Sequence, residues 1–308
     1  MRIKNVYFLI LLATLWGPSF LFIKIAVGEI PPVMLAALRI GIAGLILNTL
    51  LILKGRRLSI EKSFWKKTFI AGFFAQAVPF VLINWGEQYV DSSLASILNG
   101  LMPLFTIIFA HFMIVEEKLT RNKLGGVFLG FIGLIILVVP SISKGVEGSL
   151  AGIIAITFAS VSYGIGLSYI RKHFAKTPSF QAPAAQLLSV SIYLVPLAFL
   201  FHPDFSLFSI GYQAVGSLMV LAFFGTAIAF IVYFKLIEQS SAGYASLVTY
   251  LMPIYGVILG IVFLDERVSL WTILGAALIL VGIRLTKRVE RRKAIEPRID
   301  VALFSKFR

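Results

Sequence analysis

The chain has 308 residues, of which 59% are hydrophobic and only 14% charged, whereas soluble domains are roughly half apolar and a quarter charged. This composition indicates a protein embedded in lipid. A net charge of +14 is compatible with nucleic-acid binding, but no base-stacking or base-reading motif accompanies the basic residues, so nucleic acid is not an expected partner.

Runs of about 20 mostly apolar residues recur along the chain, each long enough to cross a hydrocarbon core of roughly 30 Å as a helix. They predict an all-α membrane protein with ten transmembrane helices, because open strands cannot satisfy their backbone in lipid. The first run is expected to be retained, since no small-residue cleavage site follows it. In chain order, spans 1 to 10 are residues 5–27, 33–53, 68–88, 93–115, 122–140, 149–170, 182–201, 213–236, 243–264 and 270–288.

The basic residues predict the topology. Most lysines and arginines fall in alternate connections and in the C-terminal tail, and such residues are retained on the cytoplasmic side. We therefore expect a multi-pass protein of the cell (inner) membrane whose N- and C-termini are both cytoplasmic. The tail carries a basic cluster that we expect to rest on anionic lipid, formed by Lys287, Arg288, Arg291, Arg292 and Lys293.

Two stretches about 150 residues apart read almost as copies of one another, which predicts a duplicated half and favours transport. Because each half has an odd number of spans, the second half enters the membrane from the opposite side, and the repeats are inverted. We expect a first repeat over 1–143, a second over 144–288 and a basic cytoplasmic tail over 289–308. The matches are Phe73-Phe74 with Phe223-Phe224, Ala95-Ser96 with Ala245-Ser246, and Leu101-Met102-Pro103 with Leu251-Met252-Pro253.

Further paired motifs carry a family resemblance. The prolines of spans 4 and 9 are followed by Glu117-Lys118 and Glu266-Arg267, and then by Gly126-x6-Gly133 and Gly275-x6-Gly282. Together with Trp16-Gly17 in span 1 and Arg39 after Pro31-Pro32, this pattern resembles the EamA family of the drug/metabolite transporter superfamily. The resemblance covers residues 5–288. The doubled Glu116-Glu117 departs from the pattern and leaves open which glutamate corresponds to Glu266.

The resemblance implies a ten-helix transporter with a central cavity lined mainly by helices 1, 3, 4, 6, 8 and 9. Helices 5 and 10 would then support the bundle or contact a second subunit. The Gly-x3-Gly motifs at Gly126 and Gly256 favour packing within the bundle, with a homodimer seam as the alternative. The superfamily carries amino acids, other metabolites and drugs, so the resemblance leaves the substrate open.

Three intramembrane prolines are predicted hinges, because proline frees a carbonyl and kinks a helix. Pro103 and Pro253 occupy matched positions in the two halves, and Pro18 lies beside Gly17 and Ser19. Tolerated proline without a hinge role is the competing interpretation.

Polar and aromatic residues inside the spans are the predicted lining of the substrate cavity. Arg39 and Gln186 share one repeat position, Asn99 and Thr249 share another, and Gln76 and Asn84 lie eight residues apart on one helix face. Helix packing, interhelical hydrogen bonds and snorkelling of Arg39 compete with this role, and belt anchoring is preferred for Tyr233 and Tyr244. The predicted lining is Trp16, Ser19, Arg39, Gln76, Asn84, Asn99, Tyr163, Gln186, Thr249 and Tyr250.

The carboxylates all fall at or near predicted helix ends, and none lies at mid-membrane, where a proton or sodium relay usually places one. This favours facilitated diffusion or exchange over tight ion coupling. Glu117-Lys118 and Glu266-Arg267 are interpreted as helix-end ion pairs. The three histidines are scattered and have no ligand-spaced partner, so neither a metal nor a cofactor is expected.

The predicted function is a secondary transporter that moves a small-molecule substrate by alternating access about a central cavity. Small amphipathic metabolites are the expected substrates, amino acids first among them, and export is the expected direction. A proton-coupled drug/metabolite antiporter is the alternative. A membrane-embedded lipid-processing enzyme is the rival from another class, although no clustered acid, base or nucleophile supports it.

Overall fold

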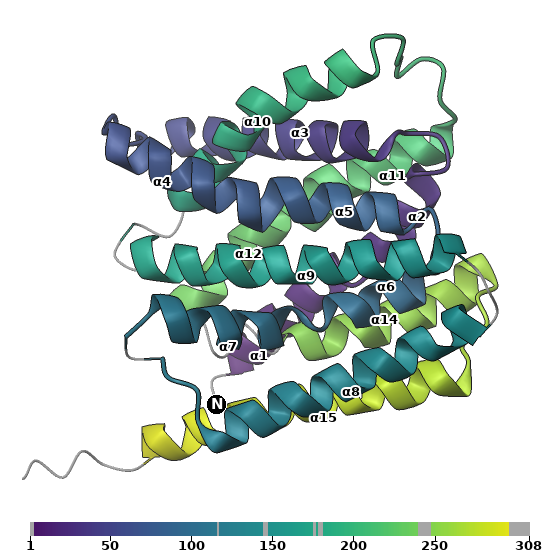
Figure 1. Cartoon of the computed structure of the whole chain (residues 1–308). Helices are drawn as coiled ribbons and strands as arrows, with labels where there is room; N and C mark the ends of the chain where they lie inside the picture. The colour runs from purple at the N-terminus through teal and green to yellow at the C-terminus, as the bar shows by residue number, and fades with distance from the viewer. Residues whose placement is uncertain are drawn as a thin grey trace, which may run out of the picture.

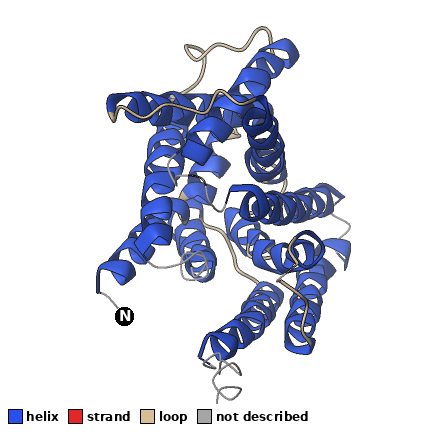
Figure 2. Ribbon diagram, turned by 90° about the vertical axis from the view of Figure 1, so that its left-hand side faces the viewer, coloured by secondary structure: helices blue, strands red, loops and turns tan. Residues whose placement is uncertain are grey.

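The computed structural model describes the backbone of residues 3–115, 117–143, 147–174, 177, 181–239 and 248–295. Helices account for the regular structure of these residues, as Figure 2 shows. Eight helical stretches are long and apolar enough to cross a membrane, and two shorter apolar stretches, Leu251–Leu264 and Leu270–Leu285, complete the ten predicted spans. The prediction of ten transmembrane helices is confirmed.

The spans of the first half are built from one to three helical segments each. Span 1 consists of α1 (Ile3–Trp16) and α2 (Ser19–Ala26), span 2 is α3 (Pro32–Leu53), and span 3 consists of α4 (Lys62–Gly72), the π-helix η1 (Phe73–Ala77) and α5 (Val78–Gly86). Span 4 consists of α6 (Ser92–Asn99) and α7 (Met102–Met113), and span 5 is α8 (Arg121–Ser143).

The second half repeats this order. Span 6 is α9 (Glu147–Phe174), span 7 is α10 (Gln181–Phe201), and span 8 consists of α11 (Tyr212–Ala222), the π-helix η2 (Phe223–Ile228) and α12 (Ala229–Gln239). Span 9 is described as α14 (Val248–Leu264), and span 10 is α15 (Leu270–Ile295). The helix of α15 thus runs past the predicted span into the start of the predicted tail, while residues 296–308 lie outside the described part of the chain.

Successive spans alternate in direction, and the start of α1 and the end of α15 lie at the same end of the bundle (Figure 1). Span 4 runs from α6 to α7 in the direction opposite to α14, as inverted repeats require (Figure 1). After the predicted topology, we call the end with the 27–31, 87–91, 202–211 and 265–269 connections the outer end. The opposite end, with the 54–61 and 114–120 connections, is the inner end.

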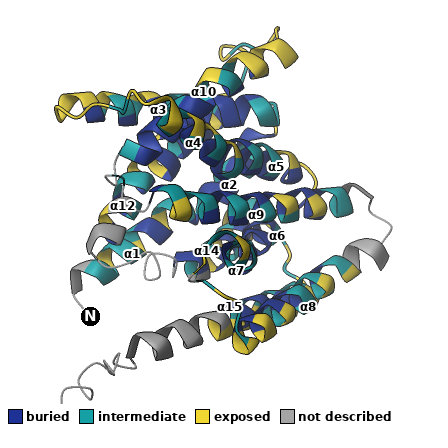
Figure 3. Ribbon diagram, turned by 60° about the vertical axis from the view of Figure 1, so that its left-hand side comes forward, coloured by how far each residue is buried: buried dark blue, intermediate teal, exposed yellow. Residues whose placement is uncertain are grey.

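Spans 5 and 10 form a separate pair along one side of the bundle, where α8 and α15 lie against each other (Figures 1 and 3). Glycines allow this close approach, because a Cβ atom added to Gly275 would lie 2.6 Å from Leu137 Cγ and 2.8 Å from the Gly133 carbonyl oxygen. A Cβ added to Gly282 would lie 2.5 Å from the carbonyl oxygen of Gly126. The paired glycines therefore hold two helices of one chain together.

Two spans are broken where the sequence combines glycine with proline. Span 1 is interrupted at Gly17 and Pro18, and span 4 at Gly100 and Leu101, just before Pro103. The prolines of spans 4 and 9 are not equivalent in the structure, because Pro103 starts α7 whereas Pro253 lies inside the continuous α14.

Candidate functional site

Spans 3 and 8 each contain a π-helical turn near their middle. These turns, η1 and η2, begin at Phe73 and Phe223, the first residues of the matched Phe-Phe pairs. A π-helical turn inserts a residue into the i→i−4 ladder and leaves backbone groups available to other partners, often at functional sites. Gln76 of η1 and Thr226 of η2 occupy corresponding positions, so each half presents a polar side chain on a distorted backbone.

Arg39 of α3 contacts the second of these turns. Its Nε donates a hydrogen bond to Thr226 Oγ1 at 2.8 Å and its Nη2 donates to the Gly225 carbonyl at 3.3 Å. The guanidinium carbon lies 4.3 Å from the centre of the Phe80 ring of α5, at cation–π range. Arg39 is 5% exposed, so its charge is buried among spans 2, 3 and 8.

Glycine at position 225 makes room for this contact. A Cβ added there would lie 3.0 Å from the Ser19 hydroxyl oxygen and 3.6 Å from Arg39 Nη2, so α2 also reaches the site. Ser19 is buried, and its hydroxyl has no hydrogen-bond partner among the residues that the structure describes. Tyr163 of α9 lies within electrostatic range of Arg39. The structure therefore brings Ser19, Arg39 and Tyr163 together as predicted cavity residues.

The first π-helical turn carries the matching contact. Gln76 Nε2 donates a hydrogen bond to Gln186 Oε1 of α10 at 3.0 Å, and both side chains are buried. Gln186 is the repeat mate of Arg39, and Gln76 is the repeat mate of Thr226. The same contact between a helix and a π-helical turn is thus built twice, once with an arginine and once with an amide. Arg39 and Gln186 do not meet each other; each contacts the turn of a different span.

Serines of α9 satisfy carbonyls that the broken helices leave available. Ser162 Oγ donates to the Phe74 carbonyl of η1 at 2.8 Å, and Ser160 Oγ donates to the Leu98 carbonyl at 3.0 Å, beside the break in span 4. Such side-chain donors allow irregular backbone to persist at membrane depth. Sequence reasoning overlooked these serines, although two hydroxyls two residues apart in an apolar span are a usable signal.

Trp16 belongs to an aromatic cluster on the inner half of span 1. Its ring lies 5.4 Å from the Tyr233 ring and 6.4 Å from the Phe230 ring, both on α12. Tyr233 thus lies against Trp16 within the bundle, whereas the sequence favoured belt anchoring for it. The side chain of Tyr250, and all of Tyr244, lie outside the described residues.

Asn84 is separated from Gln76 despite the shared helix face. Its Nδ2 donates to the Pro32 carbonyl at 3.0 Å, which ties α5 to the start of α3 near the outer end. Eight residues of helix rise by about 12 Å, so the two side chains can share a face and still lie at different depths of the bundle.

Asn99 and Thr249 are both buried, each four residues before the proline of its span. Asn99 ends α6 at the break of span 4, and its Oδ1 has no hydrogen-bond partner in the part of the chain that the structure describes. The two halves meet nearby, because a Cβ on Gly100 would lie 3.8 Å from Pro253 Cγ.

Three contacts tie the outer end together. Glu266, between α14 and α15, accepts hydrogen bonds from the Ser92 and Ser93 amides at 2.7 and 2.9 Å and from the Ser93 hydroxyl. Lys24 Nζ donates to the Glu87 and Val90 carbonyls at 2.6 and 2.7 Å, and Glu29 accepts from the Gly211 amide. We call these three contacts the outer gate.

Glu266 therefore caps the N-terminus of α6, where a carboxylate also complements the helix dipole. The predicted ion pair of Glu266 with Arg267 is replaced by this cap. At the inner end, Glu117 pairs with Arg171 at 2.7 Å, and not with the adjacent Lys118 as predicted. Glu116 lies outside the described residues, so the alternative of the doubled glutamates stays open.

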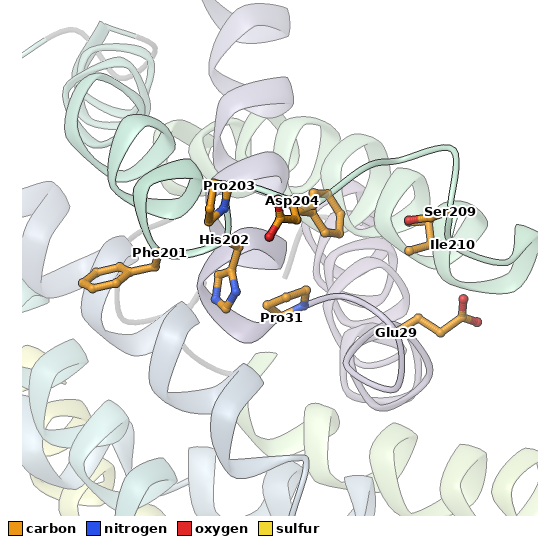
Figure 4. Close-up of a pocket in the computed structure, with 9 residues that line it drawn as sticks. Glu29, Pro31, Phe201, His202, Pro203, Asp204, Ser209 and Ile210 are labelled. Atoms are coloured by element: carbon orange, nitrogen blue, oxygen red, sulfur yellow. The ribbon is translucent and has the colours of Figure 1, made fainter.

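Two hollows open on the surface rather than at the centre of the bundle. One of about 530 Å³ lies at the outer end between the α2–α3 and α10–α11 connections, lined by residues that include Glu29, His202 and Asp204 (Figure 4). The other, of about 600 Å³, is an apolar groove between spans 3 and 6. Within the described part of the chain, no group of three or more acidic, histidine or cysteine side chains is arranged to hold a metal ion.

Comparison with known proteins places this geometry in a family. The profile of the EamA-like transporter family matches residues 3–139 and 150–288. An uncharacterized transporter of Archaeoglobus fulgidus is 29% identical over 285 residues, covering 91% of this chain and 97% of the relative. The uncharacterized transporter YoaV of Bacillus subtilis is 28% identical over 292 residues, covering 94% and 99%.

Two further comparisons concern the membrane and the fold. The uncharacterized inner membrane transporter YedA of Escherichia coli is 28% identical over 270 residues, covering 85% of this chain and 84% of the relative. One solved crystal structure aligns over 95% of this chain and 100% of its own length with a TM-score of 0.66 and 20% identity, which shows a shared fold.

Proposed function

The chain belongs to the EamA-like transporter family, and we propose that it is a secondary transporter that moves small amphipathic metabolites by alternating access. It is a multi-pass membrane transporter and not an enzyme, so the lipid-processing alternative is set aside. Amino acids are the proposed first substrates and export the proposed direction.

The duplicated polar contact carries this proposal. Arg39–Thr226 and Gln76–Gln186 are buried, lie at the middle of the bundle and involve distorted backbone in both halves. Polar groups at this depth are unfavourable unless they have a function or a partner. Their repetition in opposite directions supports a shared site from which either end can be reached.

The chemistry of Arg39 supports a carboxylate-bearing substrate. A guanidinium has five N–H donors, and the described contacts of Arg39 use two of its nitrogens. Arginine presents paired donors that match a carboxylate, so a substrate carboxylate would bind at the remaining donors. Phe80, Tyr163 and Trp16 supply aromatic surface for the apolar part of such a substrate.

The outer gate supports a cycle with at least two states. Glu266, Lys24 and Glu29 hold the outer ends of spans 1, 3, 4, 8 and 9 together in this structure. Breaking these contacts while the inner end closes would expose the Arg39 site to the outer solution. The Pro18, Pro103 and Pro253 positions are the proposed hinges. Helix breaks beside Pro18 and Pro103 concentrate backbone freedom there, and Pro253 removes one backbone hydrogen bond from inside α14.

The orientation follows from charge, and we propose that both termini are cytoplasmic. The relative from Escherichia coli is named an inner membrane transporter, which supports the same membrane here. The basic tail is proposed to contact anionic lipid, and a homodimer stays a second proposal. Proton-coupled antiport is retained as the alternative mechanism.

Uptake into proteoliposomes tests the proposal. The purified chain should give saturable uptake of at least one member of an amino-acid panel. Arg39→Gln should lower that uptake by roughly 100-fold, since truncating one partner of a buried charged contact costs about 2–5 kcal/mol. Arg284→Gln, at an exposed position of α15, is the matched control and should retain uptake. Normal uptake by Arg39→Gln would remove Arg39 from the substrate site.

A further inference from the structure

Glu87 is a buried acid that the proposed substrate site does not use. It follows the last residue of α5, just beyond span 3, and its side chain is 0% exposed. Neither carboxylate oxygen has a hydrogen-bond partner among the described residues. A buried ionised carboxylate is strongly unfavourable without partners, whereas the neutral acid is far less so. This environment therefore favours a bound proton.

Four charged groups face Glu87 from the elements around it. Three of them, Lys24 of α2, Arg39 of α3 and Glu266 after α14, act on the Glu87 carboxyl directly. The fourth, Asp91 before α6, lies four residues along the chain and shares Lys24 and Glu266 as its charged neighbours. Lys24 gives its hydrogen bonds to main-chain carbonyls, one of them that of Glu87, and not to the carboxylate. On the α9 side, the neighbours of this turn are Gly152 and Ile156, which carry no charge.

The balance of these groups agrees with the hydrogen-bond geometry. Burial raises the pKa of the Glu87 carboxyl well above its ordinary range, Lys24 lowers it, Glu266 raises it further and Arg39 lowers it. The two cations therefore do not offset the loss of water. The nearby Asp91 is exposed, so water reaches it even with the outer end closed.

Glu87 is also part of the segment that the outer gate holds. Lys24 binds the carbonyls of Glu87 and Val90, and Glu266 binds the next two amides at Ser92 and Ser93. Opening the outer end must release this short segment, which admits water to the carboxyl. The proton affinity of Glu87 and the position of the outer gate are therefore linked through one stretch of seven residues, 87–93.

We infer that Glu87 is the proton-binding site of the outer gate, taking one proton from the outer solution as the outer end closes and returning it as the outer end opens. The proton adds to a carboxylate oxygen and leaves as hydronium, so no other reactant is needed. This inference rests on the alternating access in the proposed function. Because the proton returns to the solution from which it came, it makes closure of the outer gate depend on pH and is not carried across the membrane.

The sign of the pH dependence follows from linkage. The closed state binds the proton more tightly than the open state, whose exposed glutamate has an ordinary pKa of about 4.3. The closed state is therefore fully favoured below that value. As the pH rises toward the raised pKa of the closed state, closure is disfavoured by up to about tenfold per pH unit, the limit for one proton.

Distance measurements between spin labels test the inference without a substrate. The chain has no cysteine, so Tyr89→Cys and Leu270→Cys introduce two exposed labelling sites, one on each side of the outer gate. In nanodiscs, the long-distance population should grow between about pH 5 and about pH 8. Glu87→Gln should abolish that growth and keep the closed distance at both values, because the amide mimics the neutral acid.

Two variants separate the possible failures. Asp91→Asn is the matched control and should keep the pH response, since Asp91 is already exposed with the outer end closed and gains little water when it opens. Glu266→Gln should open the gate at every pH. Suppose that Glu266→Gln opens the gate. If the parent then shows no pH response, or if Glu87→Gln keeps the pH response, the inference about Glu87 is overturned while alternating access stands. If no variant and no pH gives a second distance, alternating access fails as well.

Discussion

The cap that Glu266 places on α6 predicts a gating variant. Glu266 accepts hydrogen bonds from the backbone amides of Ser92 and Ser93 and from the Ser93 hydroxyl. These bonds add to the packing of α14 on α6 and tie the second half to the start of span 4. Glu266→Gln keeps the size of the side chain but removes its charge and replaces one acceptor oxygen with an amide that cannot accept. We expect this change to destabilise the closed outer gate selectively.

The size of the effect follows from the bonds that are lost. Hydrogen bonds to a charged group contribute about 1.5–3 kcal/mol each, and the glutamine oxygen can still accept one of them. Losing one such bond together with the favourable charge at the α6 N-terminus should cost the closed state about 2–3 kcal/mol. Since about 1.4 kcal/mol is a factor of ten, the open population should rise by roughly 30- to 150-fold.

The spin-label pair at Tyr89 and Leu270 measures this population directly. At about pH 5, where the parent is expected to be closed to above about 99%, Glu266→Gln should give a mixture of two distances. Asp265→Asn, a neighbouring exposed carboxylate for which no side-chain contact to α6 is described, is the matched control and should leave the distances unchanged. A closed distance in Glu266→Gln equal to that of the parent would refute the reasoning, because the cap would then not hold the gate.

Two other predictions concern packing and the centre of the bundle. Gly275→Ala should lower the free energy of unfolding by about 1–3 kcal/mol, because its Cβ would meet Leu137 and the Gly133 backbone. A thermal-unfolding assay in detergent checks this. The control is Gly125→Ala, whose Cβ would meet nothing within 4 Å. An unchanged midpoint would show that α8 and α15 can separate freely. The double variant Asn99→Leu with Thr249→Leu should abolish saturable uptake, whereas Thr49→Leu on the exposed face of α3 should retain it. Full uptake by the double variant would remove both residues from the substrate path.

The spans and the duplication could be predicted from the sequence because both follow from which residue types occur at which positions. Apolar runs report span length, and the repeated Leu-Met-Pro and Phe-Phe motifs report the copy. The predicted break beside Pro18 is present because glycine and proline adjoin there. Pro103 and Pro253 occupy matched positions in the sequence, but span 4 is broken before its proline and α14 is not. The residue before the first Leu-Met-Pro motif is Gly100, whereas the residue before the second is Tyr250. Tyrosine has a higher helix propensity than glycine, so the helix continues through Tyr250 and ends before Gly100.

The parts of the site that escaped prediction depend on partners far along the chain. Lys24 binds main-chain carbonyls, and Glu266 binds main-chain amides, and neither kind of partner has a residue signature. Glu87 was grouped with the helix-end carboxylates because its position along the chain is a helix end. Its burial arises from how α2, α3 and α9 close over that end, which only the assembled bundle determines.

The differences between the two halves decide which state of the transporter is populated. If both halves were identical, closing the outer end and closing the inner end would be mirror arrangements of equal free energy. Each unmatched contact then biases the equilibrium by its own free energy, and about 1.4 kcal/mol changes the ratio tenfold. Glu266 is bound to the start of α6. At the inner end, Glu117 of the corresponding Glu-basic motif forms only a partly exposed ion pair with Arg171, and exposed pairs contribute only about 0–1 kcal/mol. The outer-closed state of this structure is the one that such an imbalance favours, and a bound proton on Glu87 adds to the same side.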